Sequence, residues 1–210
     1  MTVVSDLGRL DQGTLTSSER IRDAALANFA VHGTAATSMR AVASAAGVSL
    51  GLVQHHFATK AGLIDAVDDY VLAVVLARMS EPVAAPPADS ISDIGSRVTG
   101  IIAHHPEVAS YVGRALVDGS PLGARLFDAL MDVGLARWQL RADRGETRSD
   151  VDLTWATING LVLALGAISL RAHVDRHLPE SFTAPEQLRR WQHATDSLLR
   201  EGLFRDGLRD

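Results

Sequence analysis

The sequence contains no cysteine, which excludes disulfide bonds, thiolate metal sites and a cysteine nucleophile. Aromatic residues make up only 5% of the chain, and stretches that alternate apolar and polar residues in the manner of strands are absent. Alanine and leucine are abundant, and prolines fall between segments with helical periodicity. With 47% hydrophobic residues, the chain has ample material for a core. We therefore expect an all-α protein.

The sequence also lacks recognisable catalytic motifs. It has no Gly-rich phosphate loop, no Gly-x-Ser-x-Gly elbow and no His-Glu-x-x-His pair. His173 and His177 lie one helical turn apart, but they end a polar helix, where a solvated helix end is a better interpretation than a metal site. We expect no enzyme activity, no cofactor and no metal.

Signals for export and for membrane insertion are missing as well. Residues 1–13 have neither the basic start nor the apolar core of a signal peptide. The longest apolar run, Leu153 to Leu170, contains polar side chains and is bounded by charges, so a buried helix explains it better than a membrane span. These observations predict a cytoplasmic protein with no membrane partner.

Residues 37–60 have the pattern of two short helices around a tight turn. Thr37 is a good N-cap for the first helix, from which Arg40 points away from the core. Gly47 suits the left-handed conformation just after a helix end, and Ser49 can cap a second helix. The apolar positions of the first helix recur at helical spacing: Met39, Val42, Ala43 and Ala46. The segment therefore predicts a helix-turn-helix.

The second helix of this pair has two distinct faces at about 100° per residue. The inward face is expected to comprise Ser49, Val53, His56 and Phe57. The outward face comprises Leu50, Gly51, Gln54 and His55. An outward face with two hydrogen-bonding side chains and a glycine suits close approach to another backbone, as in a recognition helix in a DNA major groove.

Several residues here resemble the signature of the TetR (tetracycline-repressor-like) family of transcription regulators. They are Ala46-Gly47-Val48-Ser49, Gly51, His56-Phe57 and Lys60, and the resemblance covers roughly residues 17–65. Members of this family commonly carry a tyrosine where this chain has Gln54, although glutamine can read adenine bidentately.

The resemblance implies a DNA-binding domain followed by a helical ligand-binding and dimerisation domain. We expect a flexible arm over residues 1–15, the helix-turn-helix domain over 16–62 and the second domain over 63–210. The expected DNA contacts are Thr37, Arg40, Ser49, Leu50, Gly51, Gln54, His55 and Lys60.

Charge is distributed unevenly along the chain. The net charge is −5, but residues 1–60 carry +1 and the remaining 150 residues carry −6. Lys60, the single lysine, falls at a helix start, where a cation opposes the helix dipole and an anionic partner such as a DNA phosphate would explain it. Because +1 is a small charge for DNA binding, we expect binding to require a dimer.

The last two long helices are too apolar for one partner to cover. Gly160, Ala164 and Ala167 form a strip of small residues on the penultimate helix, and Trp191 and Leu198 lie on an apolar face of the final one. The resemblance implies that these helices pair with those of a second copy as a four-helix bundle. The alternative is that they bury only against their own domain.

Two polar pairs interrupt apolar segments of the second domain. Arg114 and Asp118 are one turn apart, and so are Trp155 and Asn159. Because buried polar groups need partners, each pair either holds a ligand or makes an ordinary contact within the protein. The resemblance implies a small-molecule effector, and the aliphatic surroundings favour an apolar one.

These observations favour a ligand-responsive DNA-binding regulator, a repressor rather than an activator, that binds a palindromic operator as a homodimer. The alternative is a helical small-molecule-binding protein or enzyme with a vestigial DNA module. Steep weakening of DNA binding by salt distinguishes the first from the second.

Overall fold

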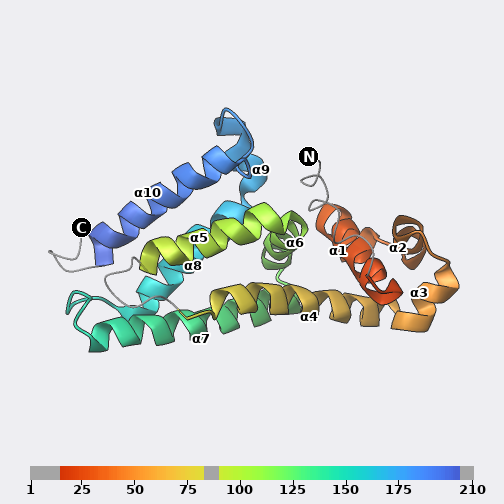
Figure 1. Ribbon diagram of the computed structural model, residues 1–210, viewed down its shortest axis with the longest axis horizontal. Coiled ribbons are helices and arrows are strands. Elements are labelled where there is room, and N and C mark those ends of the chain that lie inside the picture. Colours follow the sequence, from red (N-terminus) through yellow and green to blue (C-terminus); the bar gives the residue numbers. More distant parts are fainter. Residues whose placement is uncertain (1–14, 83–89, 204–210) are drawn as a thin grey trace, which may run out of the picture. The chain divides into compact units, whose positions relative to one another are not determined.

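The computed structural model describes residues 15–82 and 90–203 (Figure 1). Within these residues the elements are ten α-helices and one short 3-10 turn, which confirms the predicted all-α class. In chain order they are α1 (Ser17–Ala36), α2 (Met39–Ala46), α3 (Leu50–Phe57), α4 (Lys60–Met79), α5 (Ser90–His104), α6 (Pro106–Val117), α7 (Pro121–Asp143), α8 (Leu153–Ser169), α9 (Arg171–Val174), η1 (Asp175–His177) and α10 (Pro185–Leu203).

Contacts divide the chain into two compact units, Met1–Asp69 and Tyr70–Asp210. The division falls inside α4, so the two units share one continuous helix. The domain limits predicted at residues 15 and 62 stay predictions, and the predicted arm lies outside the described residues except for Leu15.

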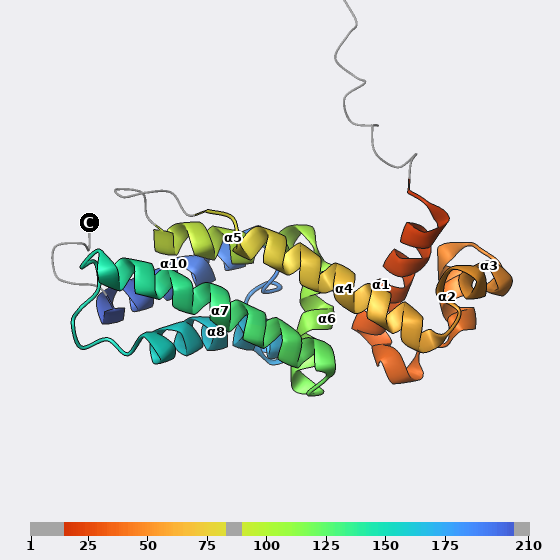
Figure 2. The same cartoon turned by 90° about the horizontal axis from the view of Figure 1, so that it is seen from below.

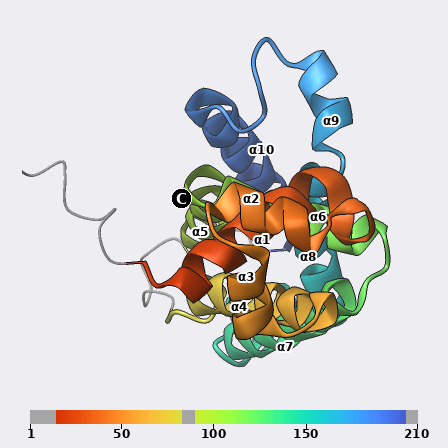
Figure 3. The same cartoon turned by 90° about the vertical axis from the view of Figure 1, so that its right-hand side faces the viewer.

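The first unit is built from α1, α2, α3 and the beginning of α4 (Figure 3). A capping box starts α1, because the Thr16 side chain accepts from the backbone N–H of Glu19 while the Glu19 carboxylate accepts from that of Thr16. Gly33 interrupts the helix with φ 80°, and the chain continues helically to Ala36. The core of the unit is formed by Ile21, Ala25, Leu26, Phe29, Val42, Ala43, Val53, Leu63 and Val67.

The second unit is organised around α8, which packs against α6 and α7 (Figure 2). Glycines on the partner helices allow this approach. A Cβ on Gly134 of α7 would lie 2.5 Å from Cγ2 of Thr157, and one on Gly113 of α6 would lie 3.1 Å from Cγ2 of Ile168.

A second layer consists of α5 and α10, which lie side by side (Figure 1). One buried cluster gathers Ile102, Ala109, Phe182 and Leu188, and the rings of Phe182 and Trp191 meet edge to face at 5.7 Å. Ala167 packs against the same cluster. Two of the residues predicted for a dimer interface, Ala167 and Trp191, thus contribute to packing within the chain.

The helical segment that begins with the apolar run at Leu153 is not continuous. It breaks at Leu170, whose ψ of 9° leaves the helical range, into α8 and the short α9 and η1. In the described part of the chain no single helix has the length and apolarity to cross a membrane. The pair Leu153–Ser169 and Arg171–His177 meets these criteria only together, across a bend of 68°.

Candidate nucleic-acid interface

The turn between α2 and α3 is held by the residues that the sequence indicated. Gly47 has φ 65° and ψ 37°, the left-handed conformation that ends α2. The Ser49 side chain then caps α3 by accepting a hydrogen bond of 3.1 Å from the backbone N–H of Leu52. The predicted helix-turn-helix is therefore present, with both termini at the turn satisfied.

Thr37 was wrongly assigned as the cap of α2. The structure shows that Ser38 caps this helix, accepting from the Ala41 N–H at 3.1 Å. Thr37 is 4% exposed, and its hydroxyl donates to the carbonyl of Gly33 at 2.9 Å. The helix break at Gly33 frees this carbonyl, so the Thr37 side chain stabilises the end of α1 and is withdrawn from the surface.

The outward face of α3 contains the residues predicted for it, and one more. Gly51, Gln54 and His55 are exposed, and Leu50 is half-buried at the first position of the helix. His56 was predicted to face inward but is exposed, and its ring contacts that of His55 at a centroid distance of 5.4 Å. Helix α3 ends at Phe57, so the core does not surround its last turn. Phe57 itself is only half-buried.

Gly51 is a glycine that internal packing does not require. A Cβ built there would meet only the Ser49 hydroxyl oxygen, at an ordinary 3.9 Å. Gly62 contrasts with it, because a Cβ there would lie 2.8 Å from the Phe57 carbonyl oxygen. The missing side chain at Gly51 thus leaves room on the outer surface, where another molecule can approach the α3 backbone closely.

Lys60 has a partner inside the protein. Thr59 caps α4, accepting from the Gly62 N–H at 3.0 Å, and the Lys60 ammonium donates to the Ala35 carbonyl oxygen at 3.1 Å. This carbonyl lies in the last turn of α1, where a cation complements the helix dipole. The ammonium has three donors, so those left after this bond can reach a phosphate.

The electrostatics of residues 38–60 are simple. They include no acidic side chain and two cations, the exposed Arg40 and the half-buried Lys60. Some charged side chains elsewhere in the unit form ion pairs with each other. Arg22 pairs with Asp23 at 2.8 Å. Hydrogen bonds from Thr16 hold the pKa of Glu19 below its usual value. The helix-turn-helix surface is therefore positive but carries few fixed charges.

The two polar pairs proposed as ligand contacts lie mostly at the surface of the single chain. Asp118 is exposed at the end of α6, and Arg114 is half-buried. Trp155 is 60% exposed and Asn159 is exposed too, both on the outward side of α8. The prediction assumed that these four side chains are buried within apolar segments. In the single chain three of them, Asp118, Trp155 and Asn159, are exposed.

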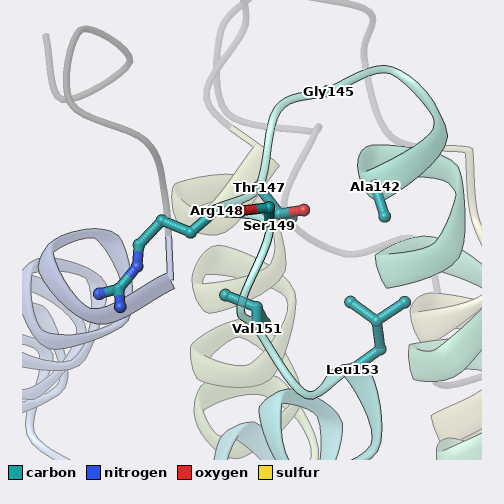
Figure 4. Close-up of a pocket in the computed structure, with 7 residues that line it drawn as sticks. All are labelled: Ala142, Gly145, Thr147, Arg148, Ser149, Val151 and Leu153. Atoms are coloured by element: carbon teal, nitrogen blue, oxygen red, sulfur yellow. The ribbon is translucent and has the colours of Figure 1, made fainter.

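A hollow of about 450 Å³ lies instead at the loop between α7 and α8 (Figure 4). Ala142 and Leu153 point toward each other on one side of it, while the Arg148 side chain extends away on the other. None of the four predicted ligand residues lines it. Its lining is Ala142, Gly145, Thr147, Arg148, Ser149, Val151 and Leu153.

The outer face of α8 is apolar and uncovered in the single chain. Besides Trp155, Val162 is 56% exposed, and Leu198 on α10 is 59% exposed. A Cβ added at Gly160 would meet no atom within 4 Å, and Ala164 is half-buried. Gly160 and Leu198, both predicted for the dimer interface, are thus available to a second molecule.

Comparison with known proteins identifies the first unit. Residues 21–67 match the family model described as "Bacterial regulatory proteins, tetR family". The regulatory protein RaaS of Mycobacterium tuberculosis is 36% identical over 118 residues, which are 56% of this chain and 53% of RaaS. The repressor Rv3405c of the same organism is 36% identical over 119 residues, 57% of this chain and 56% of the repressor. The chain thus spans about half the length of the curated relatives it matches.

Solved structures share the fold over nearly the whole chain. The structure of SmeT, the repressor of a multidrug efflux pump of Stenotrophomonas maltophilia, superposes with a TM-score of 0.70 at 20% identity and covers 94% of this chain and 93% of SmeT. SmeT has also been solved as a complex with triclosan, with a TM-score of 0.68 at 19% identity over 91% and 93% of the two chains. Both units therefore share their fold with these structures.

Proposed function

We propose that this chain, a DNA-binding transcriptional regulator of the TetR family and not an enzyme, represses transcription as a homodimer bound to a palindromic operator. A small, mainly apolar effector would release it. The observation that carries the proposal is the outward face of α3, where Gly51, Gln54 and His55 are exposed. They lie within a segment, residues 38–60, that contains no acidic side chain.

Gln54 is the residue best suited to read a base. Within the described residues, no group forms a hydrogen bond with its side chain, so both the amide N–H and the carbonyl oxygen are open to a ligand. A glutamine amide matches the donor and acceptor that adenine presents in the major groove. The bare backbone at Gly51, one turn away, allows α3 to approach the bases.

The uncovered face of α8 supports a dimer. Trp155, Val162 and Leu198 expose large apolar side chains, and such surface is normally covered by a partner. A two-fold dimer would place two copies of α3 about 34 Å apart, the distance between successive major grooves on one side of the duplex. The positive charge that one chain presents to the phosphates is small, and two copies would double it.

Release by an effector would follow from a change in the populations of two dimer arrangements. A ligand that binds better to the arrangement with the wrong spacing of α3 lowers operator affinity by its differential affinity for the two states. The triclosan complex of SmeT supports an apolar effector, and the similarity to the repressor Rv3405c supports the sense of regulation.

The test is a mobility-shift titration with DNA from upstream of the protein's own gene. Gln54→Ala should weaken specific binding by about 5- to 150-fold, because a bidentate base contact contributes about 1–3 kcal/mol. Gln139→Ala is the matched control, since Gln139 is exposed on α7 and bonds only Asp143 of the same helix. Wild-type affinity should also fall steeply with salt. An unchanged affinity of the Gln54 variant, or binding that ignores salt, would overturn the proposal.

A further inference from the structure

The helix-turn-helix segment, residues 38–60, carries few fixed cations. Between residues 38 and 60 only Arg40 and Lys60 are charged, and the Lys60 ammonium already donates to the Ala35 carbonyl oxygen. Sequence-independent affinity for DNA comes mainly from neutralised phosphates. With two fixed charges in this segment, additional positive groups would strengthen binding to the phosphates.

Two adjacent imidazoles lie at the right place to supply charge. His55 and His56 form the last turn of α3, both are exposed, and their rings meet at 5.4 Å with an interplanar angle of 70°. Protonation of both would raise the charge of residues 38–60 from +2 to +4. The C-terminal end of a helix favours such cations. Two charged rings at this distance repel each other, so a phosphate beside each ring is what would favour both protons.

The charged groups on the elements around α3 are few. Helix α2, which packs against α3, contributes only Arg40, and the first turn of α4 contributes Lys60. Within the described part of α1, Asp23 is paired with Arg22 and the Glu19 carboxylate accepts from Thr16. The remaining titratable or charged groups of α1 and of α4 in this unit are Arg20, His32, Asp65, Asp68 and Asp69.

We propose that His55 and His56 bind DNA phosphates in their protonated form, so that operator affinity rises as the pH falls. This inference rests on the proposed function, in which α3 is the helix that enters the groove. Histidine exchanges its proton between about pH 8 and pH 5, and a phosphate beside the ring favours the charged form. DNA binding is then coupled to proton uptake, and each coupled proton strengthens binding by up to about tenfold per pH unit.

The experiment measures anisotropy of upstream duplex DNA that carries a pH-insensitive rhodamine label, between about pH 8 and about pH 6. Wild-type affinity should rise at least about tenfold over this range, and His55→Gln/His56→Gln should change less than about twofold. At the lower pH the wild-type slope of log affinity against log salt should steepen by about 0.9 for each additional phosphate contact. His173→Gln is the matched control, because His173 is an exposed histidine of the second unit.

A second variant distinguishes charge from shape. His55→Lys/His56→Lys carries fixed charges and should bind tightly at both pH values. Equal pH dependence in the wild type and the double glutamine variant would overturn the inference, because another group would then take up the proton. Specific DNA binding by the wild type with an affinity that does not change with pH would also overturn it, while leaving the proposed function intact. Absence of DNA binding by the wild type at every pH would overturn both.

Discussion

Arg97 of α5 and Arg137 of α7 share one acceptor, the carbonyl oxygen of Glu81, at 2.6 and 3.1 Å. Arg137 also donates to the Met79 carbonyl, and Asp93 forms an ion pair with Arg97 at 2.7 Å. Burial, reinforced by the charge of Arg97, lowers the pKa of Arg137. Two cations therefore satisfy carbonyls at and just beyond the C-terminal end of α4, where the helix dipole is negative.

Loss of one of these arginines should loosen the end of α4. Arg137→Gln removes charge-assisted hydrogen bonds to Met79 and Glu81, and we expect it to lower the free energy of unfolding by about 1–3 kcal/mol in urea titrations. Arg189→Gln, which removes an exposed i,i+3 ion pair with Glu186, should cost less than about 1 kcal/mol. Equal losses of unfolding free energy in the two variants would show that the hydrogen bonds of Arg137 stabilise the fold no more than an exposed ion pair does.

The contact between Gly134 and Thr157 predicts a mutation and its rescue. Gly134→Ala places a Cβ 2.5 Å from the Thr157 Cγ2 and should destabilise the second unit by about 1–3 kcal/mol. Thr157→Ser removes that methyl group and keeps the hydroxyl bond to the Leu153 carbonyl, so the double variant should recover most of the loss. Thermal unfolding measures both. Gly166→Ala, where a Cβ meets no atom within 4 Å, serves as the control.

Asp196 should make stability depend on pH. It is buried between α10 and α5, and burial, opposed by hydrogen bonds from Gln192 and Ser92, raises its pKa. The folded protein then holds this proton more tightly than the unfolded chain does. The tighter hold on this proton stabilises the folded state fully below about pH 4. This stabilisation is lost as the pH rises through the raised pKa of Asp196.

Replacing Asp196 isolates this effect. Asp196→Asn should be as stable as the wild type or more so near neutral pH, with the advantage shrinking as the pH falls toward about 4. Urea unfolding at several pH values measures the difference between the two proteins. Asp128→Asn, at an exposed position of α7, should show no such trend. A wild-type-to-variant difference that is constant with pH would contradict the prediction.

The exposed face of α8 predicts a variant defective in assembly. Trp155→Glu replaces a side chain that is 60% exposed, so the fold of each chain should persist while the dimer dissociates. Sedimentation velocity measures the association and circular dichroism the helix content. Leu140→Glu, on α7, is the matched control because Leu140 is also a large exposed hydrophobic. A Trp155 variant that remains dimeric would place the interface elsewhere.

Features of the fold that depend on a few neighbouring residues could be predicted from the sequence. Gly47 and Ser49 determine the turn between α2 and α3 through backbone conformation and capping alone. Thr37 and Ser38 are both good caps, and the choice between them depends on the break at Gly33, which exposes a carbonyl that Thr37 satisfies. Periodicity carries no information about such a tertiary contact.

The remaining errors have the same origin. His56 was assigned to the inward face because a helical wheel ignores where a helix ends. Trp155 and Asn159 lie in an apolar segment, but which side of α8 its neighbours cover depends on α6 and α7. The convergence of Arg97 and Arg137 on Glu81 joins residues far apart in the chain, and no local pattern indicates it.

Selection from a random pool of duplex DNA tests the proposed function most directly. The wild-type protein should enrich an inverted repeat whose half-sites lie about one helical turn, or a multiple of it, apart, with an adenine position that Gln54→Ala no longer selects. Enrichment of no sequence, or of the same sequence by both proteins, would contradict the assignment of α3 as the reading helix and of Gln54 as its base contact.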